Sequence, residues 1–347
     1  MKAAYFESAG KIDVRDVEKP KLKNSTDAII RIVRACVCGS DLWWFRGITQ
    51  RPSGLVGHEA IGIVDSIGSA VHQIKVGDFV VVPFTHGCGK CKICLAGFDG
   101  NCPNVEKGSN GGYQAEYLRA INADGALIKI PGQPEDYSSE MLASLTTLAD
   151  VMPTGFHAAD SAEVKAGDTV VVFGDGAVGL CAVIGAKLLG ASRIIMMSRH
   201  EDRANLARDF GATDVIADRG EKAVEAVRSL TDGLGADAVL ECVGTAQSIE
   251  TAFQVARPGA IVGRVGLPHD MNYNPYMDQL FMKNIGIRGG IASVTSDVKN
   301  LLLEKVLDGS IEPGRVFSQT YKLEEIQAAY VDMDQRRTIK SLLALSD

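Results

Sequence analysis

Residues 170–179 read VVVFGDGAVG, and this stretch decides the fold. Its apolar, mostly β-branched start predicts a buried strand, and three glycines follow in G-x-G-x-x-G spacing. Residues 177–189 continue as a long apolar stretch that predicts a helix. A strand, a glycine-rich turn and a helix in this order predict a dinucleotide-binding fold, with a cofactor diphosphate at the helix N-terminus.

Each glycine of this turn has its own expected role. Gly174 permits the sharp turn, Gly176 lets the backbone approach the diphosphate, and Gly179 lets the helix pack closely on the strand. Ala177 and Val178 lie between them at the helix N-terminus, where the diphosphate is expected. An ordinary strand-to-helix turn with flexible glycines is the alternative.

The chain on both sides of the motif favours an α/β fold. Short apolar strands alternate with helices as far as residue 265, which indicates βαβ units and a doubly wound parallel sheet. The expected strands are 169–173, 193–197, 215–216, 238–242 and 260–265. The expected helices are 177–189, 201–210, 221–230 and 248–256, with later helices at 298–307 and 323–333. The first ~150 residues read as β-rich, so two domains are expected.

The end of the second strand bears on the choice of cofactor. NAD sites usually place Asp or Glu there to bind the ribose 2′-hydroxyl, but residues 194–197 are followed by no carboxylate. Guanidinium groups suit a 2′-phosphate, which favours NADP. The residues expected to bind this end of the cofactor are Ser198, Arg199, His200 and Arg203. NAD remains an alternative cofactor because the carboxylates of Glu201 and Asp202 follow directly. The alternative for Arg199 is a solvated surface charge with no role in binding.

Four cysteines fall within residues 88–102 in the spacing C-x2-C-x2-C-x7-C. They are Cys88, Cys91, Cys94 and Cys102. Four thiolates satisfy a tetrahedral Zn²⁺ and leave no open position, which predicts a structural zinc site. An iron–sulfur cluster is the rival interpretation, because ferredoxins also use C-x2-C-x2-C.

Composition excludes several classes of protein. Lys and Arg number 36 against 43 Asp and Glu, so the net charge of −7 argues against a broadly basic nucleic-acid binder. No apolar run approaches the ~18 residues of a membrane span, and the N-terminus shows no hydrophobic signal core. Eight cysteines in such a chain indicate metal binding rather than disulfides, so we expect the protein to lie in the reducing cytoplasm.

Residues 57–71 read GHEAIGIVDSIGSAV, which matches the zinc alcohol dehydrogenase signature in full. The four-cysteine segment, the glycine motif and a Cys-x-Ser-Asp element at 38–41 come in that family's order and spacing. The chain therefore resembles the zinc-dependent medium-chain dehydrogenases over essentially its whole length. Asp150 ahead of Thr-Gly-Phe-His at 154–157 makes it most similar to bacterial NADP-dependent secondary alcohol dehydrogenases, where Asp replaces a Cys ligand.

The resemblance implies a chaperonin-10-like β-barrel catalytic domain at 1–153 and 296–347, and a Rossmann domain at 154–295. It implies two Zn²⁺ per chain and a homodimer or homotetramer. The implied ligands of the catalytic zinc are Cys38, His58 and Asp150, with Glu59 as an added or alternating ligand. Asp41 would hydrogen-bond His58, and Ser40 would carry the alcohol's proton away.

One departure concerns the proton relay, because Trp43 stands where many relatives have His. An indole offers only an N–H donor and cannot relay a proton. Trp43 and Trp44 are expected either to wall the substrate pocket or to pack in the core beside it. The leading function is hydride transfer between NADP(H) and a secondary alcohol or ketone. The alternatives are a polyol, amino-alcohol or aldehyde dehydrogenase using NAD(H), and a cofactor-binding protein without catalysis.

Overall fold

The computed structural model describes residues 1–106, 111–268, 277–293 and 295–345. Its contacts divide the chain into two compact units. The first unit is Met1–Asp150 with Ser293–Asp347, and the second is Val151–Ala292. These divisions lie a few residues before the domain bounds expected from the sequence.

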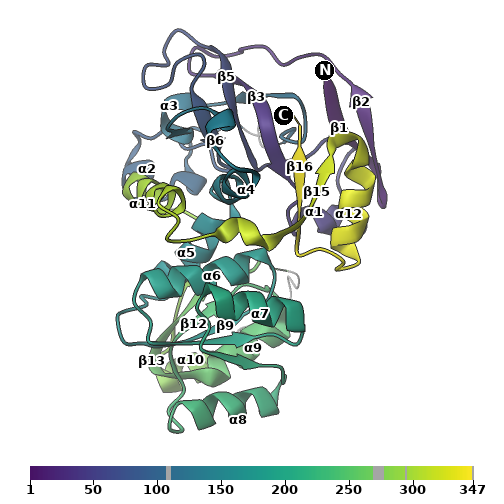
Figure 1. The fold of residues 1–347 in the computed structure, drawn as a ribbon. Helices are drawn as coiled ribbons and strands as arrows, with labels where there is room; N and C mark the ends of the chain where they lie inside the picture. The colour runs from purple at the N-terminus through teal and green to yellow at the C-terminus, as the bar shows by residue number, and fades with distance from the viewer. Residues whose placement is uncertain (107–110, 269–276, 294, 346–347) are drawn as a thin grey trace. The chain divides into compact units, whose positions relative to one another are not determined.

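A parallel sheet of six strands forms the centre of the second unit (Figure 1). Its strand order is β11-β10-β9-β12-β13-β14, with every neighbouring pair parallel. Counted along this unit, the order is the 3-2-1-4-5-6 of a doubly wound dinucleotide-binding fold, in which ligands bind where the order reverses. The strands are β9 (Thr169–Phe173), β10 (Arg193–Met197), β11 (Asp214–Ile216), β12 (Ala236–Glu241), β13 (Ala256–Arg264) and β14 (Gly286–Gly289).

Helices cover both faces of this sheet (Figure 1). Helices α5, α6 and α7 pack on one face and α8 and α9 on the other, so the central strand β9 is buried on both sides. The helices are α5 (Val151–Ser161), α6 (Ala177–Leu188), α7 (Glu201–Phe210), α8 (Glu221–Leu230), α9 (Ala246–Val255) and α10 (Met277–Lys283).

Two sheets form the β-rich first unit. A seven-stranded sheet has the order β15-β16-β3-β5-β6-β8 with β7 paired to β3, and a three-stranded sheet has the order β2-β1-β4. The first strands are β1 (Lys2–Ser8), β2 (Lys11–Asp16), β3 (Ala28–Cys36), β4 (Gly54–Leu55) and β5 (Ala60–Ile67). The others are β6 (Phe79–Val82), β7 (Tyr117–Ala120), β8 (Ile128–Ile130), β15 (Phe317–Lys322) and β16 (Lys340–Ala344).

Short helices connect and cover these strands. The α-helices are α1 (Asp41–Phe45), α2 (Lys92–Leu95), α3 (Ala123–Ala126), α4 (Ser139–Thr147), α11 (Ser296–Leu307) and α12 (Ile326–Asp334). The 3-10 helices are η1 (Asp99–Asn101), η2 (Pro134–Asp136), η3 (Pro313–Val316) and η4 (Leu323–Glu325). One large core of buried apolar residues, drawn from both sheets and from α12, holds the unit together.

The structure confirms the predicted α/β elements of the second unit, several with the same bounds. Several other bounds differ by one to four residues. The helix expected to run to 256 ends at Val255, and β13 already begins at Ala256 rather than at 260. The helix expected at 323–333 begins with a 3-10 turn, Leu323–Glu325, before α12.

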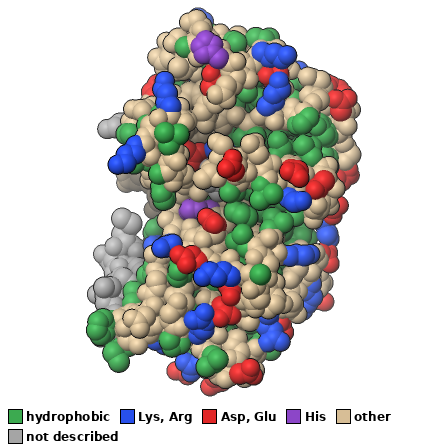
Figure 2. Space-filling view, turned by 90° about the vertical axis from the view of Figure 1, so that its left-hand side faces the viewer, with side chains coloured by type: hydrophobic (Ala, Val, Ile, Leu, Met, Phe, Trp, Pro, Cys, Tyr) green, Lys and Arg blue, Asp and Glu red, His purple; other side chains and the backbone are tan. Residues whose placement is uncertain are grey.

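The surface carries charges of both signs. On the face drawn in Figure 2, Lys and Arg side chains are interspersed with Asp and Glu side chains. Among the residues that the structure describes, no helix has both the length and the apolar character to span a bilayer.

Candidate metal centres and cofactor site

Four potential metal ligands converge in the first unit. Cys38 follows β3, His58 and Glu59 directly precede β5, and Asp150 lies beyond α4. Their ligand atoms all lie within 4.8 Å of one another. Asp150 Oδ2 is 3.6 Å from Cys38 Sγ and 3.5 Å from His58 Nε2. A zinc tetrahedron with bonds of about 2.0–2.3 Å has edges of roughly 3.3–3.8 Å, so these three atoms fit around one ion.

Asp41, the buried first residue of α1, holds two of these groups in place. Its Oδ2 accepts a hydrogen bond from the Cys38 backbone N–H at 3.1 Å, and its Oδ1 lies 3.5 Å from His58 Nδ1. The carboxylate therefore faces one ring nitrogen of His58 and leaves Nε2 turned to the cluster, as at metal-binding histidines. Ser40 precedes Asp41 as the N-cap residue of the helix.

The surroundings of Cys38 and His58 favour the protonated forms of both side chains. Burial and the nearby carboxylates of Asp150 and Glu59 raise the pKa of Cys38. Burial alone would lower the pKa of His58, but the negative charges of Asp41 and Cys38 raise it well above its usual value. A metal binds thiolate and neutral imidazole, so a divalent cation releases protons here and binds more tightly as the pH rises.

Beside the cluster, Glu59 and Lys340 form an ion pair with both side chains 0% exposed. Lys340 Nζ donates to Glu59 Oε1 at 2.7 Å and to the Val37 carbonyl oxygen at 3.1 Å. Within the described part of the chain, Glu59 Oε2 has no hydrogen-bond partner. A buried carboxylate oxygen left unsatisfied is costly, so Oε2 is a donor atom that a cation would satisfy.

Lys340 was not selected from the sequence, where its only signal is a lone lysine in the apolar run at 339–345. Burial opposes its charged form, but the charges of Cys36 and Glu59 raise the pKa of Lys340 well above its usual value. The ammonium balances the charge of Glu59, so the thiolate of Cys38 and the carboxylate of Asp150 remain to balance a divalent cation.

We expect Lys340→Met to lower the free energy of unfolding by about 3–5 kcal/mol, because it leaves the buried Glu59 carboxylate uncompensated. Urea unfolding measures the change. Lys21→Met removes an exposed lysine and is the matched control, expected within about 0.5 kcal/mol of the wild type. Equal stability of Lys340→Met and the control would show that the pair contributes nothing.

The two tryptophans lie in different surroundings. Trp44 is 7% exposed and belongs to the core of the first unit, with ring centroids 4.7 Å from Phe6 and 5.6 Å from Tyr330. These contacts support the prediction that Trp44 packs in the core. Successive residues of a helix point about 100° apart, so Trp43 points in a different direction from Trp44. Trp43 is half-buried, and its role as a wall of the substrate pocket stays a prediction. Phe84, which was not predicted from the sequence, lies edge-on to His58, with the two ring centroids 6.2 Å apart.

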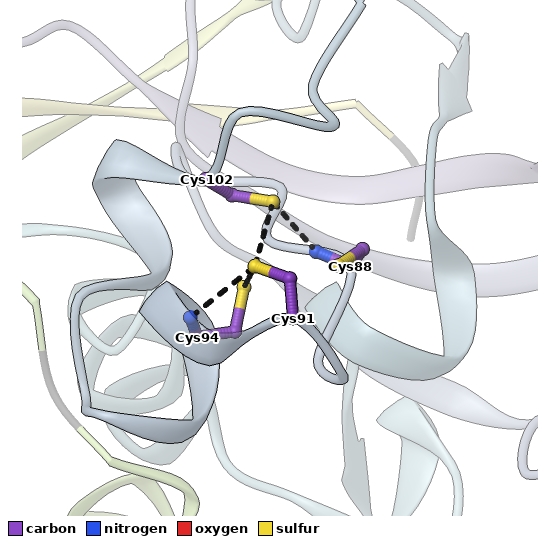
Figure 3. A group of neighbouring side chains, drawn as sticks. All are labelled: Cys88, Cys91, Cys94 and Cys102. Carbon is purple, nitrogen blue, oxygen red and sulfur yellow. Dashed lines mark hydrogen bonds between the residues drawn. The ribbon is translucent and has the colours of Figure 1, made fainter.

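The four-cysteine segment forms a second cluster, with the sulfurs of Cys91, Cys94 and Cys102 turned toward one another (Figure 3). Cys91 Sγ lies 3.5 Å from Cys94 Sγ and 3.8 Å from Cys102 Sγ. A zinc tetrahedron with Zn–S bonds of about 2.3 Å has sulfur–sulfur edges of about 3.8 Å. All four ligand atoms, including that of Cys88, lie within 4.8 Å of one another, which suits one ion rather than a multi-iron cluster.

The cysteines of this cluster differ in how readily they lose a proton. Hydrogen bonds from Asn104 and from backbone N–H groups outweigh the effect of burial and lower the pKa of Cys88 to about 6. Burial and the neighbouring sulfurs of Cys102 and Cys91 raise the pKa of Cys94 to about 12. A cation bound among the sulfurs would favour the thiolate form, because thiolate is the form of cysteine that binds a metal.

The glycine motif of the second unit lets strand β9 and helix α6 approach closely. Gly174 has φ +104°, and a Cβ on Gly179 would lie 1.6 Å from the Gly174 carbonyl oxygen, so strand and helix approach through glycine alone. A Cβ on Gly176 would meet no protein atom within 4 Å. Gly176 is the N-cap residue of α6, and the helix N-terminus at Ala177 and Val178 follows it, the kind of position at which a diphosphate binds.

The residues at the end of β10 meet a carboxylate from the glycine motif. Ser198 is 1% exposed, and its Oγ donates to Asp175 Oδ2 at 2.7 Å. Arg203 Nη1 lies 3.3 Å from the Asp175 carbonyl oxygen and 3.5 Å from Asp175 Oδ1. Arg199 is exposed, and His200 is the N-cap residue of α7. The structure thus brings together Ser198 and Arg203 through Asp175, a residue the sequence did not single out.

Comparisons with known proteins agree with this architecture. Residues 24–132 match the alcohol dehydrogenase GroES-like domain, and residues 177–308 match the zinc-binding dehydrogenase family. An uncharacterized zinc-type alcohol dehydrogenase-like protein of Bacillus subtilis is 31% identical, over 97% of both chains. Zinc-type alcohol dehydrogenase B of Aspergillus flavus is 37% identical, over 85% of this chain and 70% of that protein.

A solved structure extends the likeness to the whole chain. Alcohol dehydrogenase TADH from Thermus sp. ATN1 superposes with a TM-score of 0.91 and 32% identity, over 100% of both chains. The GroES-like domain and the Rossmann sheet define the class of zinc-type oxidoreductases. Within that class, the chain belongs to the zinc-dependent medium-chain alcohol dehydrogenase family.

Proposed function

We propose that the protein oxidises a secondary alcohol to a ketone, reversibly, with NADP as hydride acceptor. The observation that carries the proposal is the Cys38–His58–Asp150 cluster, where a carboxylate stands beside one thiolate and one imidazole. When bound, Zn²⁺ supplies a Lewis acid that polarises the substrate oxygen, and the nicotinamide exchanges a hydride with the neighbouring carbon.

The chain's own residues position and deprotonate the substrate. Cys38, His58 and Asp150 would hold the ion and leave one position open, with Glu59 Oε2 as a further donor. Ser40 would accept the alcohol's proton through its hydroxyl group, which both donates and accepts. Trp43 occupies the position from which a relay would pass the proton on from Ser40. Its indole cannot accept a proton, so the proton would leave through water or another group.

The remaining assignments divide the work between the two units. The first unit would be the catalytic domain, with Cys88, Cys91, Cys94 and Cys102 holding a second, structural zinc. The second unit would bind the cofactor. The preference for NADP is supported by Ser198, Arg199 and Arg203 at the end of β10, where NAD sites usually carry a carboxylate.

We also propose a cytoplasmic homodimer or homotetramer. Strand β14 lies at the edge of its sheet, and large apolar side chains are exposed on and near it. Phe281 is 82%, Met282 77% and Ile287 41% exposed. An open sheet edge with exposed apolar residues is typical of a surface that pairs with another chain.

Initial rates of reduced-nicotinamide formation from propan-2-ol, with NADP and NAD in parallel, test the proposed function. We expect turnover with kcat/KM at least about tenfold higher for NADP, since charge-assisted hydrogen bonds to the 2′-phosphate are worth about 1.4 kcal/mol or more. Polyols, threonine and aldehydes complete the panel. A clear preference for one of these substrates would contradict the assignment to secondary alcohols.

A further inference from the structure

Asp175 is a carboxylate that the glycine motif does not require, since the position between Gly174 and Gly176 has no fixed chemistry in G-x-G-x-x-G. Its side chain is 17% exposed and turns toward the end of β10. There it accepts the Ser198 hydroxyl at 2.7 Å and lies beside the Arg203 guanidinium, whose side chain is 12% exposed. Asp175 therefore engages two of the groups that we assign to the 2′-phosphate.

This arrangement has opposite consequences for the two cofactors. A 2′-phosphate carries up to two negative charges, and the carboxylate of Asp175 both repels them and competes for Arg203 and Ser198. A ribose 2′-hydroxyl carries no charge and donates a hydrogen bond, and a carboxylate near the end of the second strand is its usual acceptor. The charge of Asp175 therefore favours a 2′-hydroxyl over a 2′-phosphate.

We propose that Asp175 is the residue that sets the discrimination between a 2′-phosphate and a 2′-hydroxyl, by holding Ser198 and Arg203 away from the phosphate. The inference rests on the proposed use of a nicotinamide dinucleotide. It goes beyond the proposed preference for NADP over NAD, because it names the residue that limits this preference. Asp175 opposes NADP, and Arg199 and Arg203 favour it.

Calorimetric titration with 2′,5′-ADP and 5′-AMP tests this without turnover, because the two probes differ only at the 2′ position. Asp175→Asn keeps an oxygen acceptor for Ser198 and removes the charge. We expect it to tighten 2′,5′-ADP by about tenfold and to leave 5′-AMP within about twofold. The ratio of kcat/KM for NADP over NAD should rise by a similar factor.

Two further variants locate the effect. Glu225→Gln removes an exposed negative charge on α8 and is the matched control, expected to change 2′,5′-ADP affinity by less than about twofold because solvent and salt screen it. Adding Arg203→Gln to Asp175→Asn should abolish most of the gain, since the released guanidinium is missing.

The outcomes separate this inference from the proposed function. Unchanged or weaker 2′,5′-ADP binding in Asp175→Asn overturns the inference, as does an equal gain in Glu225→Gln or a full gain without Arg203. A wild type that prefers NAD contradicts the proposed NADP preference, yet supports the inference if Asp175→Asn moves binding toward 2′,5′-ADP. A wild type that binds neither nucleotide overturns both.

Discussion

We expect Asp150→Ala to lower kcat/KM for the alcohol by at least about a thousandfold and to lower the zinc content by about one ion per chain. Asp150 Oδ2 is the atom that Cys38 Sγ and His58 Nε2 both face. Its removal leaves two of three firm ligands, and an ion lost from the site takes several kcal/mol of charge stabilisation with it. About 4 kcal/mol corresponds to about a thousandfold in rate.

Two companion variants make this result specific. Asp150→Cys places a thiolate in the same position and should retain the ion and a measurable part of the activity, since thiolate is a strong zinc ligand. Asp13→Ala, at an exposed position on β2, should keep the full rate and both ions. Metal analysis and steady-state kinetics provide the measurements. Full activity in Asp150→Ala would refute its role as a ligand.

The second large effect is expected from Cys91→Ser. Cys91 Sγ contacts the sulfurs of both Cys94 and Cys102, so the substitution removes one of the four corners of the tetrahedron of sulfurs. No residue of α2 in this segment is buried, so the metal and not a hydrophobic core would hold the segment. We expect loss of about one zinc ion and a rise in amide exchange across residues 88–102 of about a thousandfold, or about 4 kcal/mol of local stability.

The control for this variant lies in the same loop. Lys90→Ser changes an exposed lysine between two of the cysteines and should leave zinc content and amide exchange unchanged. The Cys38–His58–Asp150 cluster should keep its ion in Cys91→Ser, because the two clusters share no residue. Unchanged zinc content in Cys91→Ser would mean that these cysteines hold no metal.

The parts of the fold that follow from the sequence are those with local signals. Strand β9, the glycine turn and α6 form one continuous stretch, and the helices of the second unit carry clear apolar patterns. The first unit depends on distant pairings that no local pattern specifies. Residues Leu342 and Cys36, for example, are paired between β16 and β3 from opposite ends of the chain. The end of α9 was misplaced because β13 follows it without a break.

The candidate site divides in the same way. The four cysteines were predicted as metal ligands because their spacing is distinctive. The set Cys38, His58, Glu59 and Asp150 was predicted from the family resemblance, and the structure brings both sets into compact clusters. Lys340 was missed because it reaches Glu59 across 281 positions of the chain. Asp175 was missed because the motif leaves its position undefined, and only the fold shows its carboxylate beside Ser198.

The most direct test of the central claim is to follow propan-2-ol turnover while zinc is removed and returned. The enzyme is dialysed against a chelator, zinc per chain is measured at intervals, and each sample is assayed before and after Zn²⁺ is restored. We expect about two ions at the start, a rate that falls in proportion to the loss of one of them, and recovery of the rate when that ion is restored. A rate that persists after zinc has left the protein would contradict zinc-dependent alcohol oxidation at Cys38, His58 and Asp150.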